Sequence, residues 1–223
     1  MKKTLQILVI GILLLGCKEK PSDKKEIQEE IIFNQDLVNE LERMVKIDQI
    51  AASVPQGKYK KLTLKQWNSF KDSVFTTHQK KLKQIFNTYG FVGFDLAGEN
   101  GSKNFWLMVQ HSDHNPDFQL EVLKKMKLEV DKKNANPSNY GYLVDRVYLN
   151  TGKKQVFGTQ ATYNTKTGQA YPKNLSDSLN VNQRRKALGL KPLEMYLNDL
   201  TKMHFEMNQE YYRKKGIVKP KLY

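Results

Sequence analysis

The sequence predicts a mainly α-helical single domain that carries a small β-hairpin or loop insertion near residues 154–172. Three observations favour this fold class. Apolar residues recur at the spacing of helix faces, helix-start signals precede several of these stretches, and aromatic residues are interspersed with turn residues near 154–172. The chain has 223 residues and one cysteine, so its stability depends on a hydrophobic core and on no intramolecular disulfide.

The first 17 residues have the pattern of an export signal. Two lysines precede an apolar run from Ile7 to Leu15, and a glycine comes directly before Cys17. A transmembrane helix needs about 20 apolar residues, and this run is much shorter. The segment resembles a bacterial lipoprotein signal, which implies cleavage before Cys17 and lipid chains on that residue. The expected organisation is a signal peptide at 1–16, a lipidated cysteine with a polar tether at 17–25, and one globular helical domain at 26–223. The expected location is the cell envelope, anchored by lipid to a bacterial membrane and facing the periplasm or the surface.

The formal net charge is +14, and it is distributed unevenly. Residues 24–48 carry a net charge of −3, whereas residues 58–83 carry eight basic side chains and one acidic side chain. This surplus fits either anionic partners, such as lipid headgroups or an anionic small molecule or glycan, or a lysine-rich solvated surface, and the solvated surface is the preferred interpretation. Nucleic acid is not an expected partner, because zinc-finger and RNA-reading motifs are absent from the sequence.

The first two predicted helices follow from an apolar stripe and a capping box. Residues 26–52 place apolar side chains at helical spacing, and Asp48 occupies the next position of that stripe. The stripe consists of Leu37, Leu41, Met44 and Val45. A carboxylate on an apolar stripe is the first anomaly of the sequence. The second helix is expected to start at Thr63, which can form a capping box with Gln66, and to run to Gly90.

The middle of the chain is predicted to contain a glycine-rich loop, a buried segment and two further helices. The loop covers residues 90–101, and the buried segment covers 102–111, where five consecutive apolar residues leave no polar face. A central helix is the preferred interpretation of this segment, and a strand is the alternative. Asn115-Pro116 and Asn136-Pro137 each mark the start of a following helix.

After the hairpin region, two helices are expected. A short basic helix covers residues 181–189, and a last helix opens at Pro192. The predicted inner side of the last helix consists of Leu193, Tyr196, Leu197, Leu200, Met203, Met207 and Tyr211.

Several polar residues fall on or beside apolar runs, where they are costly to bury without a partner or a purpose. We expect them to form one polar cleft. The candidate catalytic residues are His111, Asp113, Asp145 and Arg146, and the candidate ligand-binding residues are Asp48, Gln110, Gln160 and Arg184. A histidine paired with a carboxylate can act as a general base near neutral pH. The alternative is structural, because Asp113 can cap a helix end and Asp145 can pair with Arg146 or Arg184 inside the fold.

The sequence gives little sign of metal or cofactor chemistry. His111 and His114 do not have the spacing of the zinc-protease helix motif, and the chain lacks a nucleophile elbow, a phosphate loop and a dinucleotide fingerprint. The expectation is therefore no metal and no cofactor. With Cys17 acylated, the chain has no cysteine left as a nucleophile.

The ordered polar motifs resemble the bacterial domain-of-unknown-function 6624 family over roughly residues 35–200. The motifs are Asp48-Gln49, Trp106-Leu107-x-x-Gln110-His111-x-Asp113, Pro116-x-Phe118-Gln119, Leu143-Val144-Asp145-Arg146-Val147, Phe157-Gly158-Thr159-Gln160, and Arg184-Arg185-x-x-x-Gly189-Leu190-x-Pro192-Leu193. The family usually has tyrosine where this chain has Phe157. The resemblance implies that these polar residues belong together, and it supplies no reaction.

Two functions from different classes fit these observations. The first is a lipid-anchored envelope protein that binds a polar or anionic ligand in a cleft without turning it over. The second is an envelope hydrolase in which His111 acts as general base, oriented by Asp113 or Asp145, while Arg146 or Arg184 binds an anionic group. The absence of a legible nucleophile–base pair favours the first, and the sequence leaves open whether the protein is an enzyme.

The lipoprotein signal yields a direct prediction. Mass spectrometry of the mature protein should find an N-terminal Cys17 that carries acyl chains, and Cys17→Ser should move the protein from the membrane fraction to the soluble fraction. An unmodified Cys17, or cleavage at another position, would contradict the prediction.

Overall fold

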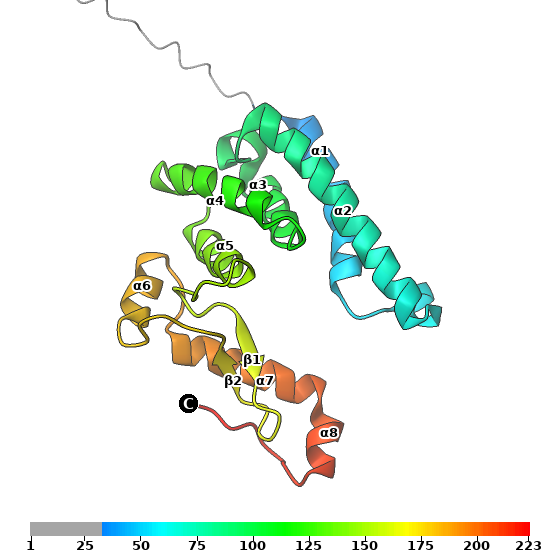
Figure 1. Cartoon of the computed structure of the whole chain (residues 1–223), viewed down its shortest axis with the longest axis vertical. Coiled ribbons are helices and arrows are strands. Elements are labelled where there is room, and N and C mark those ends of the chain that lie inside the picture. The colour runs from blue at the N-terminus through cyan, green and yellow to red at the C-terminus, as the bar shows by residue number, and fades with distance from the viewer. Residues whose placement is uncertain (1–32) are drawn as a thin grey trace, which may run out of the picture. The chain divides into compact units, whose positions relative to one another are not determined.

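The computed structural model describes residues 33–223, and these residues belong to one compact unit (Figure 1). Its first part is a pair of contacting helices, α1 (Gln35–Ala52) and α2 (Leu64–Tyr89), joined by the 3-10 helix η1 (Gly57–Lys61). The side chain of Asn34 caps α1, and Thr63 and Gln66 form the expected capping box at the start of α2. The predicted start of the first helix at residue 26 lies outside the described residues.

Three helices follow: α3 (Phe94–Gln110), α4 (Pro116–Asp131) and α5 (Pro137–Asn150). The two Asn-Pro signals act as predicted, since the Asn115 and Asn136 side chains accept hydrogen bonds from backbone N–H groups of the first turns. The helix α3 packs against α1, α2, α4 and α5, so the segment 102–111 is a central helix rather than a strand. Phe105, Met108 and Val109 in this segment are at most 1% exposed.

The predicted loop over residues 90–101 is too long, because α3 already begins at Phe94. Gly98 interrupts the helix with φ 65° and ψ 176°, a conformation that is essentially restricted to glycine. Gly101 lies where α3 approaches α1: a Cβ there would meet the Ala97 side chain at 2.6 Å and Val38 at 3.5 Å. The glycines therefore bend the helix and allow close packing instead of forming an extended loop.

The five helices α1 to α5 together form the main hydrophobic core. Aromatic and aliphatic side chains from all five helices contribute to it, among them Leu41, Leu82, Phe105, Phe118 and Leu143. Val156 and Phe157, from the segment after α5, pack against the same core. The chain after residue 160 forms a second, smaller core.

The C-terminal part begins with the predicted hairpin, whose strands β1 (Ala161–Tyr163) and β2 (Ala170–Pro172) pair antiparallel. The strand β2 contacts α7 (Leu193–Met207), which also contacts α6 (Val181–Ala187) and α8 (Gln209–Lys214). Ala170, Val181, Leu193 and Leu197 form the buried centre of this part. The described chain is thus mainly helical with one small hairpin, as the sequence predicts.

The prediction for the last helix is wrong in its C-terminal half. The observed helix, α7, ends at Met207, and α8 is a separate helix in which Tyr212 rather than Tyr211 is buried. Met203, Met207 and Tyr211 are each about half or more exposed, while Thr201 and Phe205 are buried. The buried Thr201 hydroxyl donates to Leu197 O and accepts from Ala170 N, so a polar residue fastens the hairpin to the inner face of α7.

Among residues 33–223, the structure contains no helix that is both long enough and apolar enough to cross a membrane.

Candidate functional site

The anomalous carboxylate of Asp48 lies between two histidines. Asp48 is near the C-terminal end of α1 and is 0% exposed. Its Oδ2 lies 2.7 Å from Nδ1 of His111 and accepts a hydrogen bond from Gln49 Nε2 at 3.0 Å. Its Oδ1 lies 3.7 Å from Nδ1 of His78 on α2. We call these three residues, Asp48, His78 and His111, the histidine cluster.

Both histidines of the cluster reach the protein surface. Their side chains are 14% and 18% exposed, for His78 and His111 respectively. The ring of Phe75 packs against His111 with 5.2 Å between the centroids. Each imidazole therefore presents an edge to solvent while the carboxylate between them is shielded.

The environment keeps Asp48 ionised. Burial raises the pKa of this carboxyl, but the hydrogen bonds from His111 and Gln49, the nearby imidazole of His78 and the charge of His111 lower the pKa below its usual value on balance. The contribution of this carboxylate to stability is therefore complete above the unfolded pKa, near 4, and is lost as pH falls through the lower folded pKa.

Two atoms of the cluster are left without hydrogen bonds. Among the buried side-chain nitrogen and oxygen atoms in residues 33–223, only Asp48 Oδ1 and His78 Nδ1 have no partner. Buried polar groups are ordinarily paired, and an unpaired one costs about 1–3 kcal/mol. The two atoms face each other at 3.7 Å, just beyond hydrogen-bond distance, so the histidine cluster is the one place in the described chain where buried side-chain polar atoms lack a hydrogen bond.

Asp145 is also 0% exposed, but its carboxylate is fully satisfied. Oδ1 accepts from the backbone N–H groups of Val156 and Phe157 at 2.7 and 3.0 Å. Oδ2 accepts from the N–H and the hydroxyl of Thr159 at 2.8 and 2.9 Å. The carboxylate thus binds one loop, residues 156–159, which we call the clasped loop.

Charged and phenolic side chains hold the carbonyl groups of the clasped loop. Arg184 Nε donates to Val156 O at 3.0 Å, and Arg185 Nη1 donates to Phe157 O at 2.5 Å. The Tyr196 hydroxyl donates to Thr159 O at 2.8 Å. Arg184 also forms an ion pair with Asp177 at 2.8 Å. Arg184 therefore has a structural role here, and its donors are directed at the loop and at Asp177.

Asp113 forms a third polar group with Arg146. The guanidinium donates two hydrogen bonds to the carboxylate, from Nε at 2.7 Å and from Nη2 at 2.5 Å. Asn150 and Gln119 donate to the same carboxylate at 2.8 and 3.1 Å. Burial raises the pKa of Asp113, but the hydrogen bonds and charge of Arg146 lower it below its usual value on balance. This group connects the loop before α4 with α4 and α5.

The predicted site residues therefore join in separate groups. Asp48 pairs with His111, Asp113 pairs with Arg146, and Gln160 reaches Asp145 only through the Thr159 hydroxyl, to which its Nε2 donates at 3.3 Å. Gln110 is buried at the end of α3, where its carbonyl accepts from Gln119. No side-chain hydrogen bond between described residues links the histidine cluster to the other groups. The carboxylate beside His111 is Asp48 and not Asp113 or Asp145, because those two are engaged elsewhere.

His78 is not among the residues predicted for the site, although the sequence contains a signal for it. His78 lies four residues after Val74 and four before Leu82, on the apolar stripe of α2. This is the same anomaly that marks Asp48 on α1. Arg185 and Gln155 are also absent from the predicted site residues; they are 1% and 0% exposed and hold the clasped loop and its neighbours. Burial of such long polar side chains depends on tertiary contacts that the sequence does not display.

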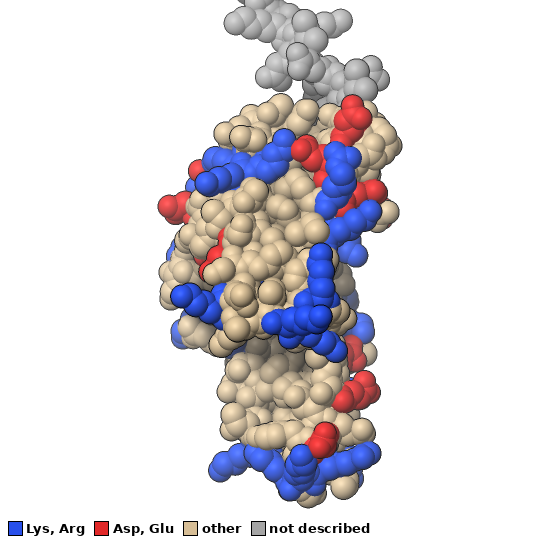
Figure 2. All heavy atoms as spheres, turned by 90° about the vertical axis from the view of Figure 1, so that its right-hand side faces the viewer, with Lys and Arg blue, Asp and Glu red and all other residues tan. Residues whose placement is uncertain are grey.

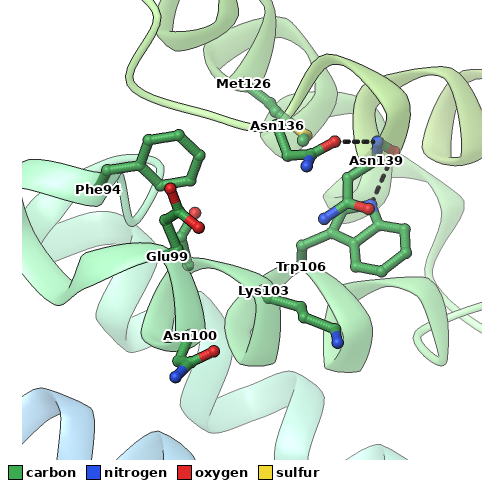
Figure 3. Close-up of a pocket in the computed structure, with 9 residues that line it drawn as sticks. Phe94, Glu99, Asn100, Lys103, Trp106, Met126, Asn136 and Asn139 are labelled. Carbon is green, nitrogen blue, oxygen red and sulfur yellow. Dashed lines mark hydrogen bonds between the residues drawn. The ribbon is translucent and has the colours of Figure 1, made fainter. Parts of the chain in front are cut away.

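A pocket of about 390 Å³ lies elsewhere, between α3 and the start of α5 (Figure 3). Phe94 and Glu99 line one side, and Trp106, Lys103 and Asn139 line the other. Part of this wall is structural, since Trp106 Nε1 donates to Asn139 O at 2.8 Å. Its lining residues include none of the predicted site residues.

The described residues do not assemble a metal site. In residues 33–223, no group of three histidine, cysteine, aspartate or glutamate side chains is arranged to hold an ion.

The protein is thus a mainly helical domain with two characteristic features: a loop held by the buried carboxylate of Asp145, and a buried Asp48–His111 pair. The chain belongs to a family of unknown function, DUF6624, whose model matches residues 35–206. The match covers α1 to α7 almost completely, including the histidine cluster and the clasped loop. Comparison with curated proteins and comparison with solved structures gave no match.

Proposed function

We propose that this protein is a lipid-anchored component of the bacterial cell envelope that binds a polar, anionic ligand, a small molecule or a glycan, at the histidine cluster. The anchor is Cys17, for the reasons that its sequence context gives. The observation that carries the ligand proposal is the pair of imidazoles, His78 and His111, that flank the buried Asp48 carboxylate and reach the surface.

The chemistry of the cluster supports an anionic ligand. A protonated imidazole forms an ion pair with the Asp48 carboxylate through Nδ1 and donates from Nε2 at its outer edge. Two such edges, from His78 and His111, can bind the oxygens of one phosphate or carboxylate group. The other carboxylates predicted for the site are saturated with hydrogen bonds, as is Asp145 in the clasped loop.

Anion binding can be tested with inorganic phosphate as the probe. Imidazole resonances in NMR spectra recorded at pH 6 should shift for His78 and His111 as phosphate is added, with saturation. His78→Gln and His111→Gln should each weaken binding by about tenfold or more, because each removes a charge-assisted hydrogen bond worth about 1.5–3 kcal/mol.

The matched control for these variants is His114→Gln. His114 is exposed and lies three residues from His111, outside the histidine cluster. It should leave the phosphate affinity unchanged. Equal responses of all three histidines to phosphate would show unspecific binding and would contradict the proposed site.

A second candidate function, hydrolysis, is supported by the 2.7 Å contact between Asp48 and His111. A carboxylate that accepts from Nδ1–H fixes the imidazole tautomer and leaves Nε2 as a proton acceptor, as a general base requires. In residues 33–223, no hydrogen bond occupies His111 Nε2. In this candidate mechanism, Asp48 is the carboxylate that orients the imidazole of His111.

Hydrolysis of p-nitrophenyl acetate and p-nitrophenyl phosphate separates the two candidates. A general base predicts turnover that falls about 10²–10⁴-fold in His111→Gln while the circular dichroism spectrum stays unchanged. Turnover that is equal in the wild type, in His111→Gln and in His114→Gln would exclude His111 as the base for these substrates.

A further inference from the structure

We propose that the corner formed by the end of α1, by η1 and by the start of α2 docks onto the anionic surface of a lipid bilayer. This docking corner consists of residues 46–65. Membrane docking is a separate role from ligand binding at the histidine cluster. It rests on the proposed function only in one respect, that the lipid anchor would keep the docking corner near a membrane.

A hollow with apolar walls and a basic rim lies in the docking corner. The hollow has a volume of about 460 Å³, and Ile50, Val54 and Tyr59 supply its apolar walls. Lys46 and Lys58 also line it, together with uncharged polar side chains and Gly57. No acidic residue is among its lining residues. Such a site suits the anionic headgroup and the upper acyl carbons of a phospholipid.

Large apolar side chains are exposed around this hollow. Ile47 and Ile50 are 41% and 36% exposed on α1, Val54 is 66% exposed just after it, and Leu64 is 76% exposed at the start of α2. Ile47 and Ile50 are three residues apart on α1 and so share one side of that helix, and Ile50 and Val54 both line the hollow. Exposure of these apolar side chains to water is unfavourable in free energy, whereas at a bilayer surface they can be buried among acyl chains.

The exposed charge of the docking corner is positive. Residues 46–65 contain five lysines, and their one acidic residue, Asp48, is buried. Lys46, Lys58, Lys60, Lys61 and Lys65 are all exposed, and none of them forms a salt bridge with another residue of the described chain. Figure 2 views the molecule from the side on which α2 lies in Figure 1 and shows blue side chains grouped over the middle of this face. Unpaired lysines beside exposed apolar residues are typical of proteins that bind anionic lipid surfaces.

The corner is rigid enough to present these side chains together. The rings of Tyr59, Trp67 and Phe70 lie 5.0–5.7 Å apart and attach η1 to α2. The capping box at Thr63 and Gln66 fixes the turn between them. Gln49 lines the hollow and also donates to Asp48, so the docking corner adjoins the histidine cluster.

Chain length allows the corner and the lipid on Cys17 to reach one bilayer. The helix α1 has 18 residues and is about 27 Å long, and the corner lies at its C-terminal end. The residues from Cys17 to the start of the described chain can span at most about 55 Å. This reach exceeds the length of α1.

Vesicle sedimentation tests the proposal without the lipid anchor. The protein is the chain from residue 17 onward with Cys17→Ser, because residues 33–223 belong to one compact unit. It should sediment with vesicles of phosphatidylglycerol and phosphatidylcholine, and should bind pure phosphatidylcholine at least tenfold more weakly. The triple variant Lys58→Ala, Lys60→Ala, Lys61→Ala should bind the anionic vesicles about 100-fold more weakly, at about fivefold for each lysine.

The matched control removes three lysines elsewhere, Lys124→Ala, Lys125→Ala and Lys154→Ala, which are exposed and outside the docking corner. This control should retain binding within about threefold, and Val54→Asp should weaken it through the apolar contact. Equal losses in the two triple variants, or equal binding to neutral vesicles, would overturn the proposal. The assay uses protein without the lipid on Cys17. An unmodified Cys17 in the natural protein would therefore refute the proposed anchor without affecting the vesicle-binding result.

Discussion

The buried carboxylate of Asp145 is the interaction on which the arrangement of the C-terminal half depends. It accepts four hydrogen bonds, all from the clasped loop. Burying an ionised carboxylate costs several kcal/mol, and hydrogen bonds to a charged group return about 1.5–3 kcal/mol each. The four hydrogen bonds together offset this cost and hold the loop against α5. Its carbonyls are held in turn by Arg184, Arg185 and Tyr196, so the main core and the smaller core share this loop.

The same observation explains why residues that are distant in sequence occur together in the family's motifs. Asp145, Arg184 and Arg185 all contact the clasped loop, to which Thr159 belongs. The resemblance indicated that these residues belong together, and the structure gives the reason as loop architecture. What sets Asp48 apart is its environment. It is equally buried, but its partners are titratable imidazoles with edges at the surface, and one of its oxygens is unpaired.

Local signals in the sequence predicted most of the fold. The capping box at Thr63, the two Asn-Pro starts and the all-round apolar run at Phe105 depend on near neighbours, and each matches the structure. The errors have tertiary causes. The kink at Gly98 and the inward Thr201 follow from packing against other segments. The site was predicted in part for the same reason: a stripe anomaly can flag Asp48, but which carboxylate faces His111 depends on how α1 meets α3.

The two buried aspartates are expected to differ in kind, Asp145 being structural and Asp48 part of the proposed binding site. The unfolding free energies of Asp48→Asn and Asp145→Asn at neutral pH distinguish these two roles. An asparagine at 145 leaves a buried donor facing backbone N–H groups and should lower the unfolding free energy by about 1–3 kcal/mol or more. An asparagine at 48 can accept from His111 and donate to the unpartnered His78 Nδ1, so it should cost less than about 1 kcal/mol while anion binding is lost. A loss at 48 as large as that at 145 would show that Asp48 is a structural anchor and would contradict the account.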